Sequence, residues 1–345
     1  METLNCGSGG GSTTDFKLRI ASIFIIFIGS CSGALFPVLA KRSSWLHVPK
    51  SVFDFAKYFG SGVIIATAFI HLLSPALDAL SSPCLPKGWS EYPYALALCL
   101  LSIFLIFIVE LVAFRWGTAK LAKVGKSHDA HGHSLGSHAA HGPEATFKSP
   151  LSPQVKDDST NSDIESAKEA VDVDVHAHGI EDTVAIQIIG VGILEFGVVL
   201  HSFLIGLTLA VDEQFKILFV VLVFHQTFEG LGIGSRLAYL QLTSRYNWVP
   251  IAGAMIYGIT TPLGIAIGLG VRTSYNPGST TASIVSGTLD SLSAGILVYT
   301  GLVELFAHEF LFNKEMMSSS NGKLAYAVGS MCLGCALMAL LGKWA

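Results

Sequence analysis

The sequence predicts an all-α, polytopic membrane protein, and two observations support this fold class. The 345 residues are 51% hydrophobic and only 13% charged, with a mean hydropathy of +0.57. A soluble domain needs more charge to cover its surface. Apolar runs of about 18 residues or more also recur along the chain, and each is long enough to cross a bilayer as a helix. The small net charge of −4 argues against a nucleic-acid partner.

The apolar runs define eight predicted spans, which follow a polar tail over residues 1–17. The tail is rich in Gly and Ser, and the next run is too long for the apolar core of a cleaved signal peptide. We therefore expect an unfolded tail before the first spanning helix. The spans cover approximately residues 18–40, 53–80, 93–116, 184–210, 215–238, 249–271, 283–312 and 324–342.

Lysine and arginine residues gather in the loops that follow the odd-numbered spans, as at Lys41 and Lys120. The positive-inside rule places those loops in the cytosol and both termini outside the cell. We therefore expect an extracellular tail, helices one to three over residues 18–116, a cytosolic connection over 117–183, and helices four to eight over 184–345.

The 117–183 connection is polar and has too few apolar residues to fold alone, so we predict that it is disordered. It is also rich in histidine, and neutral imidazoles in such tracts bind zinc or neighbouring metals weakly. The alternative is a solvated linker with no role. The candidate weak ligands of this loop are His128, His131, His133, His138 and His141.

The six cysteines are scattered, and most of them lie inside apolar runs. This spacing predicts no disulfide framework. Cys332 and Cys335 have the spacing of a metal-binding pair, but thiols in a helix of small residues are more often part of the packing.

The fourth and fifth spans carry the strongest functional signal. A tight acidic turn over residues 212–214 joins them, so they must be antiparallel neighbours. His201 and His225 lie about 11 and 12 residues from that turn, which places both at about 16–18 Å below the surface. Glu229 follows His225 by one helical turn and points from the same face. Two imidazoles and a carboxylate thus converge near the midplane.

Ionisable groups at that depth are costly unless they are paired or hydrated, so the cluster indicates a functional site. Imidazole nitrogen and carboxylate oxygen are the ligands that zinc and similar divalent ions prefer. The rival interpretation is that His201 and His225 only hydrogen-bond between packed helices. The matched depth of the two histidines, with Glu229 one turn away, favours a metal site. Ser202 is a candidate weak oxygen ligand.

Two further sets of side chains lie where a metal route would begin and end. In the second span, His71, Pro75 and Asp78 are spaced to share one helix face toward the outer half of the membrane. In the seventh span, Glu304 and His308 lie one turn apart near the cytosolic end and suit a ligand pair at an inner exit. The alternative for both sets is interfacial or interhelical side chains without a metal.

The motifs HSFLIG (201–206) and HQTFEG (225–230), the eight spans and the His-rich connection resemble those of the ZIP (Zrt-, Irt-like) family of divalent metal transporters. The sequences of spans two, five and seven are most like those of zinc uptake members from fungi and plants. The resemblance implies metal uptake into the cytosol, a site shared by spans four and five, a homodimer and residence in the plasma membrane. It also implies an inner-route role for Glu304.

Members of that family with a two-metal centre carry acidic residues at two positions where this chain has Ile205 and Gln226. The resemblance therefore implies a single ion, bound by His201, His225 and Glu229, with Ser202 and Gln226 as neutral auxiliary ligands.

We expect a carrier that moves Zn²⁺, with Fe²⁺, Mn²⁺ and Cd²⁺ as alternative cargo, and that needs no prosthetic group. The expected route runs from His71 and Asp78 through the central site to Glu304 and His308. A membrane metalloenzyme is the first rival, but the spans contain no HExxH or serine nucleophile box. A metal-sensing receptor with the His-rich loop as its output is the second. The lipid bilayer is the remaining partner.

Overall fold

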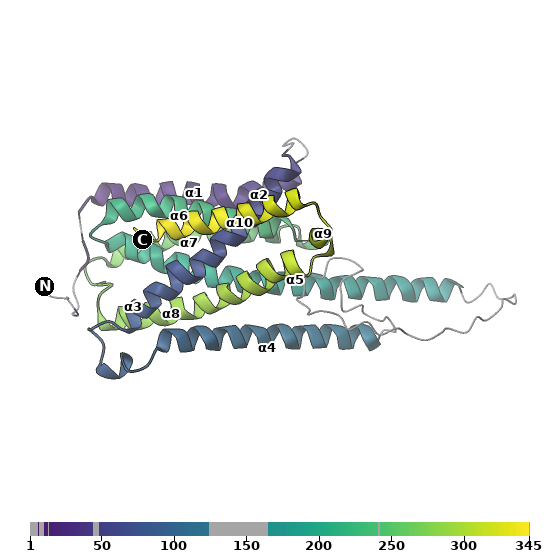
Figure 1. Cartoon of the computed structure of the whole chain (residues 1–345), viewed down its shortest axis with the longest axis horizontal. Coiled ribbons are helices and arrows are strands. Elements are labelled where there is room, and N and C mark those ends of the chain that lie inside the picture. Colours follow the sequence, from purple (N-terminus) through teal and green to yellow (C-terminus); the bar gives the residue numbers. More distant parts are fainter. Residues whose placement is uncertain are drawn as a thin grey trace.

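The computed structural model confirms the all-α fold and the eight predicted spans (Figure 1). It describes residues 6, 10–12, 14–43, 48–123, 165–240 and 242–344, and within them it leaves out the side chains at 113–114, 116–123 and 165–187. The spans cover Phe16–Arg42, Lys50–Leu80, Tyr94–Val112, Ile188–Val211, Phe215–Ala238, Ser244–Val271, Thr280–Leu311 and Asn321–Leu341.

The longer helices correspond to these spans, and two spans change helix type along their length. The helices are α1 (Phe16–Arg42), α2 (Lys50–Ala66), α3 (Ser74–Leu80), α4 (Tyr94–Lys123), α5 (Glu165–Val211), α6 (Phe215–Ala238), α7 (Val249–Val271), α8 (Thr280–Tyr299), α9 (Lys314–Met317) and α10 (Asn321–Leu341). The π-helical segment η1 (Thr67–Leu73) joins α2 to α3, and η4 (Thr300–Leu311) continues α8. Short 3₁₀ turns are η2 (Lys87–Trp89) and η3 (Ser244–Tyr246).

The spans pack as two bundles. The first bundle consists of α1, α5, α6 and α7, and the second bundle consists of α2, η1, α3, α4, α8, η4 and α10. The bundles meet mainly where α2 crosses α6 and where α5 crosses α8. At the first crossing a Cβ on Gly60 would collide with Gly232, and a Cβ on Gly232 would lie only 3.0 Å from the Gly60 backbone oxygen, so glycine suits this close approach.

Two helices continue well past their spans. The long extensions of α4 and α5 project from the end of the bundles opposite to the start of α1 and the end of α10 (Figure 1). Helix therefore covers residues 117–123 and 165–183 at the two ends of the stretch for which we predicted disorder. Good helix formers such as Glu165, Ala167 and Lys168 explain why a helix continues where hydropathy no longer requires one.

Two sets of contacts join separate segments at the end of the bundles where α1 begins. The buried Arg19 of α1 donates to the backbone oxygens of Leu209 (3.1 Å) and Asp212 (2.7 Å), and so joins the start of α1 to the end of α5. Cys6 forms a disulfide with Cys84 of the α3–α4 loop. The prediction of no disulfide was wrong, because it counted spacing within one segment, whereas this bond joins residues separated by 78 positions.

Candidate metal centre

The central site lies where α5 and α6 run side by side below their shared turn. His201 lies ten residues before the end of α5 at Val211, and His225 lies ten residues after the start of α6 at Phe215. At about 1.5 Å per residue, both side chains lie about 15 Å below the turn. The matched depth predicted from the sequence is therefore present.

The donor atoms of His201, His225 and Glu229 converge. One ligand atom from each of these side chains lies within 4.8 Å of the others, and they are the only such group of three found in the described part of the chain. His225 Nε2 is 3.9 Å from Glu229 Oε2, and the two imidazole centroids are 5.6 Å apart. Two atoms bound to one tetrahedral zinc lie about 3.4 Å apart, so small side-chain movements would close the cage.

The site is buried, and its polar atoms lack protein partners. His225 and Glu229 have no exposed surface, and His201 is 3% exposed. Within the described residues, no hydrogen-bond partner is found for His201 Nε2, for either ring nitrogen of His225 or for Glu229 Oε1. Buried donors and acceptors in this state are costly, whereas a divalent cation would satisfy all of them at once.

The two predicted auxiliary residues lie beside the carboxylate. Ser202 Oγ is 3.5 Å from Glu229 Oε2, and Gln226 Nε2 is 3.5 Å from Ser202 Oγ. Both side chains are fully buried. These distances are long for hydrogen bonds, so Ser202 and Gln226 lie near the three central side chains but are not held rigidly against them.

Sequence reasoning missed Tyr257 of α7, which orients this side of the site. Its hydroxyl lies 2.7 Å from Gln226 Oε1, 2.7 Å from the Gln226 backbone oxygen and 3.4 Å from Glu229 Oε2. A ligand carboxylate is usually held in place by such an outer partner. The only available signal was a tyrosine in an otherwise apolar run, which could not be assigned to α5 or α6 before the packing was known.

The second bundle brings two further groups to the same level. His71 of η1 packs edge-on against His225, with ring centroids 4.6 Å apart, and its Nε2 lies 2.8 Å from the Met338 backbone oxygen. Asp290 of α8 has Oδ1 3.8 Å from His201 Nδ1, which is too far for a hydrogen bond. Sequence analysis noted no function for Asp290, because its partner lies on a distant span. The central site therefore lies where the two bundles meet.

The shared face predicted for the second span is absent. His71 is buried, whereas Pro75 and Asp78 are exposed. The π-helical hydrogen bonds of η1 change the rotation per residue, so spacings taken from an α-helix do not apply there. His71 thus lies beside the centre, and Asp78 lies nearer the outer end of the span.

Tyr275 of the α7–α8 loop is a further polar group near Asp290. Burial raises the pKa of its phenol, and the nearby Asp290 carboxylate raises it further, although a hydrogen bond with Thr208 acts in the opposite direction. The phenol of Tyr275 therefore stays neutral beside Asp290.

Glu304 and His308, the predicted exit pair, both lie on the π-helical segment η4, and their pairing stays a prediction. Glu309, one residue after His308, lies near Glu304 through a shared neighbour. Both carboxylates face Arg236 of α6, at 3.2 Å for Glu304 Oε2 and 3.9 Å for Glu309 Oε1. His308 is half-buried and takes part in another contact.

The candidate loop ligands fall outside the description of the structure. His128, His131, His133, His138 and His141 all lie outside the described residues, so their role stays a prediction.

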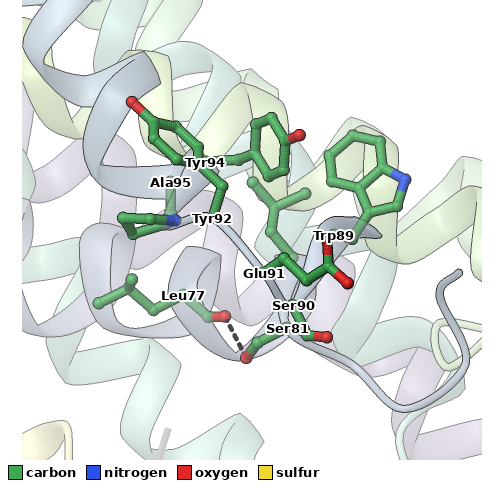
Figure 2. Close-up of a pocket in the computed structure, with 10 residues that line it drawn as sticks. Leu77, Ser81, Trp89, Ser90, Glu91, Tyr92, Tyr94 and Ala95 are labelled. Atoms are coloured by element: carbon green, nitrogen blue, oxygen red, sulfur yellow. Dashed lines mark hydrogen bonds between the residues drawn. The ribbon is translucent and has the colours of Figure 1, made fainter. Parts of the chain in front are cut away.

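A pocket of about 270 Å³ lies at the outer rim, between α3 and the start of α4 (Figure 2). Its lining includes Trp89, Tyr92 and Tyr94, and the Tyr94 ring centroid is 5.0 Å from each of the other two. One carboxylate, Glu91, is present, but no histidine or cysteine. The pocket therefore has the character of an interfacial aromatic belt rather than a metal site.

The sequence also matches known proteins. Residues 16–342 match the family model described as "ZIP Zinc transporter". Zinc-regulated transporter 2 of Saccharomyces cerevisiae is 36% identical over 99% of this chain and 97% of its own length. Zinc-regulated transporter 1 of the same yeast is 41% identical over 95% of this chain and 87% of its own length. Zinc transporter 9 of Oryza sativa subsp. japonica is 33% identical over 95% and 89%, respectively.

Proposed function

Because the chain belongs to the ZIP zinc-transporter family, and is therefore a multi-pass membrane transporter of zinc and not an enzyme, we propose that it moves zinc into the cytosol through His201, His225 and Glu229. The observation that carries this proposal is the cluster of buried donor atoms without protein partners.

The donor set suits a carrier better than a storage site. Two neutral imidazoles and one carboxylate compensate only part of the charge of a divalent ion, so binding replaces the water shell without holding the ion permanently. Ser202, Gln226 and Asp290 supply further oxygen atoms nearby. Fe²⁺, Mn²⁺ and Cd²⁺ are alternative cargo for the same ligands.

The inward direction is what the family resemblance implies, and two independent observations support the orientation of the chain that goes with it. Lysines and arginines gather at the end of the bundles from which α4 and α5 extend, and the positive-inside rule makes that end cytosolic. The Cys6–Cys84 disulfide lies at the other end, and disulfides persist in an oxidising compartment. Both termini are therefore extracellular in this proposal, and the protein occupies the plasma membrane.

The proposed route begins at Asp78 and Asp290, passes His71 and reaches the central site. The ion then leaves past Glu304 and His308 of η4, which are the proposed exit residues. The remaining elements of the proposal are a homodimer and weak metal binding by the histidines of the cytosolic connection.

Zinc uptake in cells that express His201→Ala or Glu229→Ala tests the proposal. Uptake should fall to the background of untransformed cells while the surface amount of protein persists. Glu91→Gln is the matched control, because it removes an exposed carboxylate at the outer rim and should leave uptake unchanged. Normal uptake by either site variant would refute the central site.

The cargo preference needs a purified system. Proteoliposomes that take up radiolabelled zinc should be inhibited by other divalent ions in the order of their affinity for imidazole and carboxylate ligands. Substrate turnover without metal flux would instead support a metalloenzyme.

A further inference from the structure

An arginine joins the cytosolic ends of the two bundles. Arg236, in the last turn of α6, belongs to the first bundle, and its guanidinium points at two carboxylates of η4 in the second bundle. Nη2 lies 3.2 Å from Glu304 Oε2, and Nη1 lies 3.9 Å from Glu309 Oε1. The exposed fractions of Arg236, Glu304 and Glu309 are 18%, 19% and 5%, so solvent screens this contact only partly.

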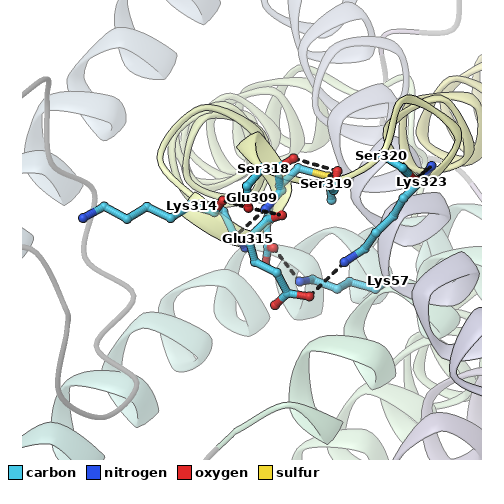
Figure 3. A network of polar contacts seen from close by, with 10 residues as sticks. Lys57, Glu309, Lys314, Glu315, Ser318, Ser319, Ser320 and Lys323 are labelled. Atoms are coloured by element: carbon cyan, nitrogen blue, oxygen red, sulfur yellow. Dashed lines mark hydrogen bonds and ion pairs between the residues drawn. The ribbon is translucent and has the colours of Figure 1, made fainter.

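Other residues of the second bundle fix the positions of these two carboxylates. Lys57 of α2 reaches Glu309 from within the same bundle (Figure 3). Glu304 lies beside Glu110 of α4, which accepts a hydrogen bond of 2.6 Å from the Tyr299 hydroxyl. The position of both acceptors is thus set by α2, α4 and η4, and Arg236 is the only cation that approaches them from the first bundle among the described ion pairs.

The same arginine lies on the path that a released ion must follow. Arg236 follows Glu229 by seven residues, so it lies two turns nearer the cytosol on the same face of α6. An ion that leaves Glu229 along this face meets Glu304 and Glu309 with a guanidinium already bound. Among the described residues, no group of three metal ligands is found at this level.

We infer that Arg236 is a positioning residue for release: it holds the cytosolic ends of α6 and η4 together, and the departing divalent ion replaces it on Glu304 and Glu309. Replacement is favourable because three carboxylates, Glu110, Glu304 and Glu309, face only two cations, Arg236 and Lys57. A doubly charged ion in place of the guanidinium balances the remaining negative charge. The role in release depends on the proposed central site, but the closure itself depends only on this geometry.

The rate at which a buried thiol becomes reactive from the cytosolic side tests the closure. Ser235→Cys is the reporter, because Ser235 is 1% exposed and neighbours the arginine on α6. In inside-out vesicles without metal, Arg236→Gln should raise its labelling by a membrane-impermeant maleimide on the order of 10-fold, and Arg236→Lys should have a smaller effect. Variants without the reporter supply the background from native cysteines.

Two further measurements separate an ionic closure from a purely structural role. Higher salt should accelerate labelling of the reporter protein and leave the Arg236→Gln form unchanged, because screening acts only where the ion pair exists. Arg245→Gln is the matched control, since Arg245 lies on the same side between α6 and α7, outside the contact with η4, and it should leave the rate unchanged.

Equal labelling rates with and without Arg236, in protein that elutes as a single folded species, would overturn the inference. If Arg236→Gln does not fold, Glu309→Gln decides the question, because it removes one acceptor and should also accelerate labelling. Loss of zinc binding in His201→Ala bears only on the central site, whereas thiol labelling without metal bears only on the closure, so the two proposals fail separately.

Discussion

Replacement of Tyr257 by phenylalanine tests how the central carboxylate is held. The hydroxyl of this fully buried tyrosine lies 2.7 Å from Gln226 Oε1 and 3.4 Å from Glu229 Oε2, so the change removes a polar group that orients the metal ligand and leaves the ring in place. Hydrogen bonds to a charged group contribute about 1.5–3 kcal/mol. Loss of a partner of this kind weakens metal binding by about 10–100-fold.

Zinc affinity of the purified protein, measured by competition with a zinc-binding dye, is the assay for Tyr257→Phe. Uptake at low external zinc should fall in parallel and recover in part at high zinc. Tyr326→Phe is the matched control, because its hydroxyl hydrogen-bonds the Ser51 backbone oxygen at 2.9 Å, far from the site. A zinc affinity within twofold of the unaltered protein would show that Tyr257 does not position Glu229.

Three other outcomes are expected. Gly232→Val overpacks the contact with Gly60 and should destabilise the protein by about 1–3 kcal/mol, seen as a lower unfolding midpoint in detergent; an unchanged midpoint would contradict the described crossing of α2 and α6. On intact cells, the Cys84 thiol should react with an impermeant maleimide only after an impermeant reductant is added, and labelling without reductant would contradict the disulfide. Deletion of residues 128–141 should leave zinc uptake intact and alter only its regulation; loss of uptake would support the sensor hypothesis.

The sequence was sufficient for the spans and for the convergence of the three central side chains, because both depend on local rules. Hydropathy fixes the length of a membrane helix, and the short turn at 212–214 forces α5 and α6 to be neighbours. Equal distances from that turn then bring His201 and His225 to the same depth. No knowledge of the other spans was needed.

The residues that were missed depend on packing between distant segments. Asp290 reaches His201 only because α8 crosses α5, and Tyr257 reaches Glu229 only because α7 packs in the first bundle. The contact of Glu304 and Glu309 with Arg236 was missed for the same reason, because Arg236 lies on α6 and reaches η4 only where the two bundles meet.

X-ray absorption at the zinc edge of the purified, zinc-loaded protein tests the central claim most directly. We predict a first shell of nitrogen and oxygen atoms at about 2.0–2.2 Å that contains two imidazoles, and the loss of one imidazole in His225→Ala. A spectrum with two imidazoles that does not change in His225→Ala would mean that zinc binds elsewhere in the chain.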